Sequence, residues 1–377
     1  MLSRMKFEID QLINGILDQL PESLWHSTSS TFFDPAIGGG QFVRAIEQRL
    51  RSYGHSDSNI RHRVFGLEES DLHLRYAVNK HNLVGQYAKK SYETFIELDD
   101  TMKFDVVIGN PPYQKSSAGT RLGSRGTADL WPDFVRKCLS ILNNKGHMAL
   151  IHPTSWRKPE DRNNFWKLLT QDNQMKRLVM SSGKKDQDWF GIGVRVDAYI
   201  VEKTPKYTTT RVVDHENLEY DLDLSKFDWL PNFALNEISS LLGTGCKVLY
   251  NTYYHTQKDH LDYPTSDYKF PVVHTINQQG LGIRYFNSQQ DNDTTHFGVP
   301  KVLLNQNELQ YPYNDYKGQY GMSQLTFGIA ISSKKEGDEI VAYLNSDAGK
   351  RLIAATKWNT FYTDYGMFKS FRKDWYK

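Results

Sequence analysis

The sequence lacks most of what marks secreted, metal-binding and membrane proteins. Its two cysteines, Cys138 and Cys246, lie far apart and form no ligand pattern, so neither a disulfide framework nor a metal site is expected. No apolar run approaches the roughly 18 residues that suggest a membrane span. Residues 1–20 mix charged with apolar residues and lack the apolar core of a signal peptide. We therefore expect a cytoplasmic protein in a reducing compartment, without membrane contact.

An excess of charge of one sign is also absent. The chain has 46 Lys and Arg against 44 Asp and Glu, a formal net charge of +2. This balance neither supports nor excludes nucleic acid as a partner, because a local basic face can serve where the total is neutral. Internal repeats and low-complexity tracts are missing too. At roughly 150 residues per domain, the 377 residues suggest two domains, and we expect a monomer.

Apolar strand-like and amphipathic helix-like segments alternate from residue 30 to about residue 203. This order predicts an α/β domain with a doubly wound, parallel, Rossmann-like sheet. The expected strands are 31–34, 63–68, 104–110, 147–153 and 196–203, and the expected helices are 5–20, 42–53, 70–83 and 129–146, the last closed by Gly146.

The amino-acid composition and the pattern of apolar residues change after Thr204-Pro205. Residues 206–377 are rich in Tyr, Asn, Gln, Asp and Gly, with short β-like runs at 301–306 and 326–333 and a helical stretch or pair at 339–356. We therefore predict a first domain over 1–205 and a C-terminal α+β domain over 206–377.

A glycine-rich turn follows the first expected strand and opens a helix. Residues 34–42 read DPAIGGGQF, and glycine lets the backbone turn sharply and approach a ligand closely, as we expect of Gly40. The second strand ends at Glu68, whose carboxylate can accept hydrogen bonds from ribose hydroxyls. The alternative is a purely structural turn, with Glu68 capping the next helix. The two features together favour a nucleoside ligand, although the pattern differs from the GxGxxG of dinucleotide sites.

Asn110-Pro111-Pro112-Tyr113 ends the third expected strand, FDVVIG, where a ligand crevice should lie. An exocyclic aromatic amine is a poor nucleophile because its lone pair is delocalised into the ring. Acceptors for both amine hydrogens, the Asn110 side-chain oxygen and the Pro111 carbonyl, would localise that pair. Two prolines hold these groups on a rigid turn, and Tyr113 offers a face for a planar base and for developing positive charge.

With these motifs in place, the sequence resembles the S-adenosylmethionine-dependent amino-methyltransferases of DNA in the gamma arrangement. In that arrangement the cofactor motif precedes the catalytic motif, and a target-recognition region follows. The chain looks most like the Eco57I-type adenine-N6 methyltransferases of restriction-modification systems, over about residues 5–204. The resemblance makes Asn110, Pro111, Pro112 and Tyr113 catalytic, and it assigns cofactor binding to Asp34, Pro35, Ala36, Gly38, Gly40, Phe42 and Glu68.

The resemblance has further implications and two departures. It implies that Leu130, Trp131 and Phe134 pack near cofactor and base. No Thr-Pro element precedes the first helix, so no residue is assigned there. The family often carries an Asp-x-Leu segment after its own third strand. The corresponding region here, which precedes FDVVIG, reads YETFIELDD, and Glu93 is the stand-in for cofactor binding.

Two basic segments are candidates for contact with DNA phosphates. Residues 114–128 are small, polar and glycine-rich, and they suit either a linker or a segment that closes over DNA. The C-terminus, FKSFRKDWYK, mixes cations with Phe371, Trp375 and Tyr376, which is typical of nucleic-acid contact but also of a packed terminal helix. The candidate residues are Lys115, Arg121, Arg125, Arg372 and Lys373.

The alternatives to a DNA adenine methyltransferase are methyl transfer to RNA or to a protein glutamine amide, and a DNA-binding protein without activity. About 170 residues follow the catalytic domain and almost none precede it, which favours an extended polymer as substrate. The first-position asparagine favours adenine over cytosine N4. The expected partners are therefore double-stranded DNA and, in a restriction-modification system, a cognate restriction endonuclease.

Overall fold

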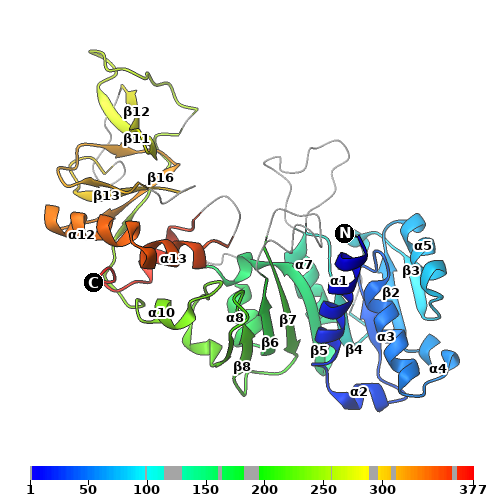
Figure 1. Cartoon of the computed structure of the whole chain (residues 1–377). Helices are drawn as coiled ribbons and strands as arrows, with labels where there is room; N and C mark the ends of the chain where they lie inside the picture. The colour runs from blue at the N-terminus through cyan, green and yellow to red at the C-terminus, as the bar shows by residue number, and fades with distance from the viewer. Residues whose placement is uncertain are drawn as a thin grey trace. The chain divides into compact units, whose positions relative to one another are not determined.

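A computed structural model of the chain divides into two compact units (Figure 1). One unit comprises Met1–Trp156 and Asp161–Asp228, and the other comprises Arg157–Glu160 and Trp229–Lys377. The structure describes residues 2–97, 100–113, 130–159, 164–181, 195–255, 257–287, 296–306, 311–358 and 363–377, with the side chains of 2–8 left out.

The first unit is built on a nine-stranded mixed sheet in the order β3-β2-β1-β4-β5-β7-β6-β8-β9. The five strands from β3 to β5 are parallel, and β7 is antiparallel to both of its neighbours. The strands are β1 (Phe32–Asp34), β2 (Val64–Glu68), β3 (Gln86–Lys89), β4 (Phe104–Gly109), β5 (Leu142–Pro153), β6 (Gln174–Met180), β7 (Val196–Glu202), β8 (Thr210–Val213) and β9 (Glu219–Leu222).

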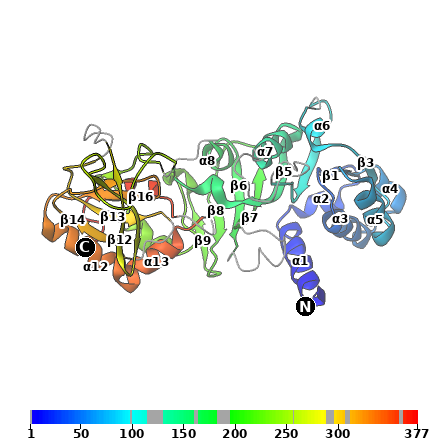
Figure 2. The same cartoon turned by 90° about the horizontal axis from the view of Figure 1, so that it is seen from above.

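Helices cover both faces of this sheet (Figure 2). One face carries α1 (Leu2–Leu17), α3 (Gln41–Ser52) and α5 (Asp71–His81), and the other carries α6 (Tyr92–Glu97), α7 (Trp131–Ser140) and α8 (Phe165–Thr170). The short helices α2 (Glu22–His26) and α4 (Asp57–Arg61) and the turn η1 (Thr154–Arg157) join these elements.

The two strand faces explain the two helical layers. Along β1, Phe32 belongs to the core shared with α1 and α3, whereas the next residue, Phe33, stacks on Phe104 and packs against Phe95 of α6 on the opposite face. A strand that buries alternate residues on opposite faces has to be covered on both. The predicted α/β fold class is therefore confirmed.

Two boundaries and the direction of one strand differ from the sequence-based expectations. The helix expected over 129–146 ends at Ser140, and β5 begins at Leu142, because Leu142 pairs with Phe104 of β4. The last strand of the expected parallel set, β7, runs antiparallel between β5 and β6. The hairpin β8–β9 adds to the sheet beyond residue 205, so the compact units divide after Asp228, later than the predicted boundary.

The second unit joins two small sheets to a layer of short helices. A four-stranded sheet has the order β10-β16-β13-β14, and a three-stranded sheet has the order β12-β11-β15. The helical stretch or pair expected at 339–356 is present as two helices, α12 (Lys334–Asn345), which begins before the expected range, and α13 (Asp347–Ala355). The other elements are α10 (Leu235–Ser239), α14 (Gly366–Lys369), β10 (Val248–Leu249), β11 (Phe270–Asn277), β12 (Gly280–Phe286), β13 (Lys301–Asn305), β14 (Tyr313–Asp315), β15 (Gly321–Met322) and β16 (Thr326–Ala330); the short turn η2 (Leu224–Lys226) closes the first unit.

None of the helices among the described residues has the length and apolar character needed to cross a membrane.

A buried carboxylate holds the outer edge of the sheet against α3. Glu47 of α3 is 0 % exposed and accepts hydrogen bonds from Val84 N and Gly85 N, both at 2.9 Å, and from the Tyr87 hydroxyl at 2.7 Å. Arg51, one turn later, donates to the same carboxylate at 3.0 Å. The charge of Glu47 therefore lies buried with donors from α3, β3 and the turn before β3.

We predict that Glu47→Ala lowers the free energy of unfolding by about 3–5 kcal/mol, because removing one member of a buried, hydrogen-bonded charge pair leaves its partners unsatisfied. Chemical denaturation followed by circular dichroism measures the change. Glu22→Ala is the control: its side chain is 74 % exposed, and we expect a change within about 0.5 kcal/mol. Equal effects of the two substitutions would contradict the assigned role of Glu47.

Candidate functional site

The predicted site residues follow three neighbouring parallel strands. Asp34 ends β1, Glu68 ends β2, and Asn110 comes directly after β4. Strand β1 lies between β2 and β4 in the sheet, with Asp34 opposite Gly66 in the register. Because parallel strands end at the same edge of a sheet, their order brings the glycine loop (residues 34–40) and the Asn-Pro-Pro-Tyr turn to one edge of the sheet.

Hydrogen bonds to the backbone fix most residues of the glycine loop. Ala36 N donates to the Asp34 carboxylate, Ile37 N to Leu67 O and Gly38 N to the Glu68 carboxylate, each at 2.9 Å. From the other side, the His81 ring nitrogen Nε2 lies 3.0 Å from Gly39 O and can donate to it. The loop is therefore ordered before any ligand binds.

The two predicted glycines of the loop face different surroundings. Both have positive φ, 54° at Gly38 and 82° at Gly40, which favours glycine. A Cβ at Gly38 would lie 3.9 Å from its nearest contact, but a Cβ at Gly40 would lie 3.0 Å from Ala77 and 3.1 Å from His81. Gly40 thus packs against α5, and a side chain at this position would meet that helix.

Asp34 has a strongly perturbed carboxyl group. It is 1 % exposed; Oδ1 accepts from Ala36 N, and Oδ2 has no hydrogen-bond partner among the described residues. Burial raises its pKa from 3.8 to about 7; the Ala36 hydrogen bond opposes this, and the charge of Glu68 adds to it. The missing Cβ of Gly109 leaves room for this group, since a Cβ there would lie 2.7 Å from Asp34 Oδ1.

The Asn-Pro-Pro-Tyr turn is internally bonded. The Tyr113 hydroxyl donates to Asn110 Oδ1 at 2.6 Å, and Leu130 N, before α7, donates to Tyr113 O at 3.0 Å. Pro111 is buried, whereas Asn110, Pro112 and Tyr113 are half-buried. The turn is thereby fixed at both ends, and the Asn110 amide has an oriented acceptor oxygen.

The other predicted binding residues lie in different environments. Glu68 is 3 % exposed and accepts from Gly38 N and, at 2.9 Å, from Ser70 N. Pro35 is buried and Ala36 half-buried, while Phe42 is 8 % exposed within the core under α3. Glu93 is exposed in the first turn of α6.

Residues of α7 and β5 form an aromatic stack beside the turn. Trp131 stacks on His152 with ring centroids 4.5 Å apart, and His152 Nε2 lies 2.8 Å from the Tyr199 hydroxyl. Burial lowers the pKa of His152 to about 3, so the ring is neutral. Leu130 and Phe134 are buried as well, and Phe134 packs on Phe95 of α6.

Three residues that belong to this site were missed from the sequence. Gly109 and His152 each stand at the carboxyl end of a central strand, a position that could have singled them out. His81 carries no such signal, because it ends α5 and reaches Gly39 only through the tertiary fold.

The predicted DNA contacts are only partly within the described residues. Lys115, Arg121 and Arg125 lie outside them. Arg372 and Lys373 are exposed. The aromatic residues on either side of these cations, however, are core residues: Phe371 and Trp375 are 0 % exposed and Tyr376 9 %. The expectation of an exposed basic and aromatic surface at the C-terminus is therefore wrong for the aromatic residues, because they fill the core of the second unit.

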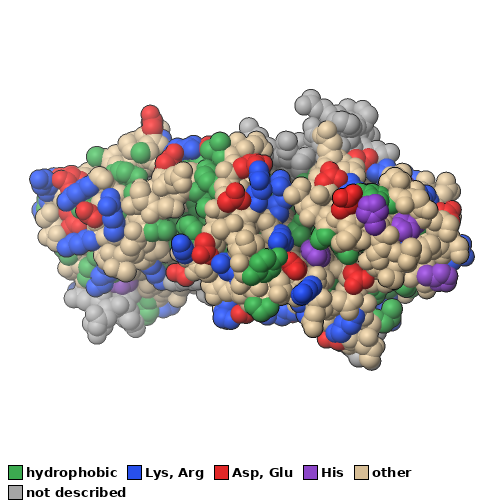
Figure 3. All heavy atoms as spheres, turned by 90° about the horizontal axis from the view of Figure 1, so that it is seen from below, with side chains coloured by type: hydrophobic (Ala, Val, Ile, Leu, Met, Phe, Trp, Pro, Cys, Tyr) green, Lys and Arg blue, Asp and Glu red, His purple; other side chains and the backbone are tan. Residues whose placement is uncertain are grey.

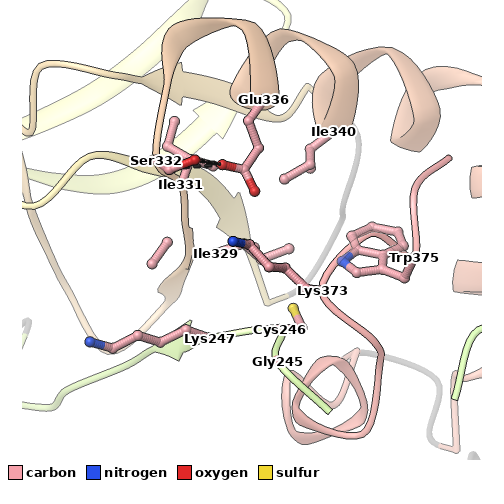
Figure 4. A pocket seen from close by; sticks show the side chains of 11 residues that line it. Gly245, Cys246, Lys247, Ile329, Ile331, Ser332, Glu336, Ile340, Lys373 and Trp375 are labelled. Carbon is pink, nitrogen blue, oxygen red and sulfur yellow. Dashed lines mark hydrogen bonds between the residues drawn. The ribbon is translucent and has the colours of Figure 1, made fainter. Parts of the chain in front are cut away.

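A small cavity lies beside this C-terminal segment (Figure 4). It has a volume of about 190 Å³ and is lined by Cys246, Lys247, Glu336, Lys373 and Trp375, among others. The Lys373 ammonium points toward Glu336, and Lys247 points away from the cavity (Figure 4). Against the effect of burial, the positive charge of Lys373 acts on the Glu336 carboxylate and helps to lower its pKa. Acidic and basic side chains are also interspersed on the face drawn in Figure 3.

Comparison with known proteins agrees with the resemblance deduced from the sequence. Residues 23–186 match the model of the Eco57I restriction-modification methylase family. An uncharacterized adenine-specific methylase of Mycoplasma pneumoniae is 38% identical over 66 residues, 17% of this chain and 15% of that protein. The type II methyltransferase M.BstVI of Geobacillus stearothermophilus is 22% identical over 152 residues, 37% of this chain and 26% of that protein.

The solved structures support the fold. The type IIL restriction-modification enzyme MmeI, solved in complex with DNA, matches 98% of this chain and 64% of its own with a TM-score of 0.50 at 12% identity. The chain thus spans less than two thirds of each of these relatives. The expected resemblance to Eco57I-type enzymes is confirmed over the matched residues.

We predict that ionisation of Asp34 destabilises the native state. A native pKa of about 7 against the usual 3.8 means that the folded state binds the proton more tightly. The contribution of Asp34 to the free energy of unfolding therefore falls as the pH rises from 3.8 to about 7, and it stays constant at higher pH. Asp34→Asn cannot ionise, so its stability relative to the wild type should rise over this interval by up to about 4 kcal/mol. Denaturation curves at several pH values measure this difference, and a constant offset between the two proteins would contradict it.

Proposed function

We propose that this chain is a site-specific DNA adenine-N6 methyltransferase that uses S-adenosylmethionine and acts on a flipped adenine. The observation that carries the proposal is the convergence of two motifs at neighbouring strand ends. The Asn110 turn follows β4, the preorganised glycine loop follows β1, and Asp34 packs against Gly109 between them. The family match over residues 23–186 and the name of the Mycoplasma relative support adenine as the target.

The residues around the glycine loop fit an S-adenosylmethionine molecule. The open side of Gly38, the buried and unpartnered Oδ2 of Asp34 and the carboxylate of Glu68 are the groups that such a ligand would find there. S-adenosylmethionine, when bound, supplies a methyl carbon attached to a positively charged sulfur. We assign its binding to Asp34, Pro35, Ala36, Gly38, Gly40, Phe42, Glu68 and Glu93, of which Gly40 and Phe42 act by supporting the loop.

Asn110 prepares the target amine for reaction. Its Oδ1 already accepts the Tyr113 hydroxyl proton, but an amide oxygen has two lone pairs and can accept a second hydrogen bond. One amine hydrogen would bond Asn110 Oδ1 and the other Pro111 O. These bonds would draw the nitrogen toward a tetrahedral shape and localise its lone pair, which prepares the amine to accept a methyl group.

Tyr113 is the proposed support for the extruded base. The amine of a paired adenine lies within the base stack, where a rigid turn at a strand end cannot reach it. Extrusion costs a few kcal/mol, and stacking of the base on the half-buried Tyr113 ring would offset part of this cost. Pro112 restricts the backbone that carries the ring.

The second unit is the proposed target-recognition region. Its residues, 229–377 with 157–160, form a compact body with its own core, as a reader of an extended duplex requires. The comparisons do not favour transfer to RNA or to a protein glutamine, and modified-base sequencing of DNA from cells that express the protein tests DNA as the substrate. We further propose a role in restriction-modification or DNA protection, in the cytoplasm, with a cognate endonuclease as a partner.

We predict that Asn110→Ala slows methyl transfer to DNA on the order of a hundredfold or more, the loss typical of removing one positioned group that acts mainly in the transition state. Binding of S-adenosylhomocysteine, measured by calorimetry, should stay near the wild-type value because Asn110 acts on the target amine. Asn79→Ala, at an exposed position of α5, is the control. Near-normal turnover by Asn110→Ala would refute the assigned mechanism.

We also predict that His81→Ala weakens S-adenosylhomocysteine binding about three- to tenfold, the net value of one hydrogen bond. The loss of the bond to Gly39 O loosens the glycine loop before the ligand arrives. The side chain introduced by His81→Gln can still donate and should restore part of the affinity. Lys80→Ala, on the exposed side of the same turn, should have no effect. Unchanged affinity in His81→Ala would remove His81 from the site.

A further inference from the structure

A two-stranded hairpin in the second unit has features that suit contact with DNA bases. Strands β11 and β12 pair antiparallel from Phe270–Phe286 at the base to Asn277–Gly280 at the tip, so the turn itself is Gln278-Gln279. Figure 1 draws this hairpin at the end of the second unit opposite α10 and α13. All four residues from 277 to 280 are exposed.

The tip is held rigidly although it is exposed. Ile276, next to the tip, is 5 % exposed and packs with Val273 and Leu303. The backbone of Ile276 is held on both sides by Asn305. Ile276 N donates to Asn305 Oδ1 at 3.0 Å, and Asn305 Nδ2 donates to Ile276 O. These two bonds oppose a shift in the register of the strand. Asn277 Oδ1 accepts from Gln279 N at 2.9 Å and so forms the turn. The amide side chains of Gln278 and Gln279 are not needed for any of these bonds.

The charge of the hairpin suits a polyanion. Residues 268–286 contain no Asp or Glu, but they include Lys269 and Arg284. The pKa of His274 is lowered to about 4, first by burial and then by the positive charge of Arg284. The two strands themselves therefore carry no carboxylate, although Asp262 lies close enough for its charge to act on His274.

Its dimensions and side chains match the major groove. Two paired strands lie about 4.8 Å apart, and a two-stranded ribbon fits a major groove about 12 Å wide. A glutamine amide offers one donor and one acceptor, which pair in bidentate fashion with N7 and N6 of adenine.

We infer that the β11–β12 hairpin enters the major groove and that Gln278 and Gln279 read base edges there, with adenine as the preferred base. This inference rests on the proposed function and adds to it the element that determines sequence specificity. Because Asn277 and Ile276 fix the backbone, the two glutamines can be replaced without loss of the hairpin.

The test is the methylation pattern of the full-length protein, mapped by modified-base sequencing of random-sequence duplex DNA. Gln278→Ala and Gln279→Ala should each lose discrimination at one position of the recognition sequence by roughly tenfold or more, while the other positions and the affinity for S-adenosylhomocysteine stay unchanged. Gln278→Arg should shift the preference at its position from adenine to guanine, which Arg contacts through O6 and N7. Gln319→Ala, exposed on the loop after β14, is the matched control.

Each other outcome is informative. An unaltered recognition sequence in both alanine variants overturns the inference and leaves the proposed function standing. A uniform loss of DNA affinity with the same sequence preference assigns the hairpin to the phosphate backbone and also overturns base reading. If the wild-type protein binds S-adenosylhomocysteine but methylates no DNA, the proposed substrate is wrong, and the inference falls with it.

Discussion

The close packing of the Asp34 carboxyl group against Gly109 is the contact on which the site depends. It joins the end of β1 to the end of β4, and no larger residue than glycine leaves room for it at position 109. The contact places the start of the glycine loop directly beside the residue before Asn110. It also buries a carboxyl group with one unpartnered oxygen, and the cost of this burial appears as the raised pKa of Asp34.

Around this contact the chain uses its backbone more than its side chains to order the site. The amides of Ala36, Ile37 and Gly38 are bonded to groups of β1 and β2, and His81 of α5 holds the next carbonyl. A loop whose conformation is fixed in advance loses little entropy when a ligand arrives. The same logic applies to the Asn-Pro-Pro-Tyr turn, in which proline geometry and the Tyr113 hydroxyl limit the freedom of Asn110.

The second unit combines a well-packed interior with an exposed hairpin. Aromatic residues from the C-terminal segment, which the sequence offers as stacking surfaces, instead pack with Trp229 and Phe368 in the core. Lys301, also buried, pairs with Asp315 at 2.9 Å. The polar tip of the β11–β12 hairpin therefore projects from a well-packed unit. This suits an element that contacts DNA bases in a fixed conformation.

The sequence by itself determined the fold class of the first unit and the motifs at its strand ends, because apolar periodicity and strand-end motifs are local properties of the chain. It also indicated the helix pair 339–356. Only the tertiary structure decided that β7 runs antiparallel, that β8 and β9 extend the sheet past residue 205, and that Gly40 faces α5. It likewise decided the parts played by Gly109 and His81 and the burial of Phe371 and Trp375. Each of these depends on which segments, distant along the chain, become neighbours in space, and local residue patterns do not encode that choice.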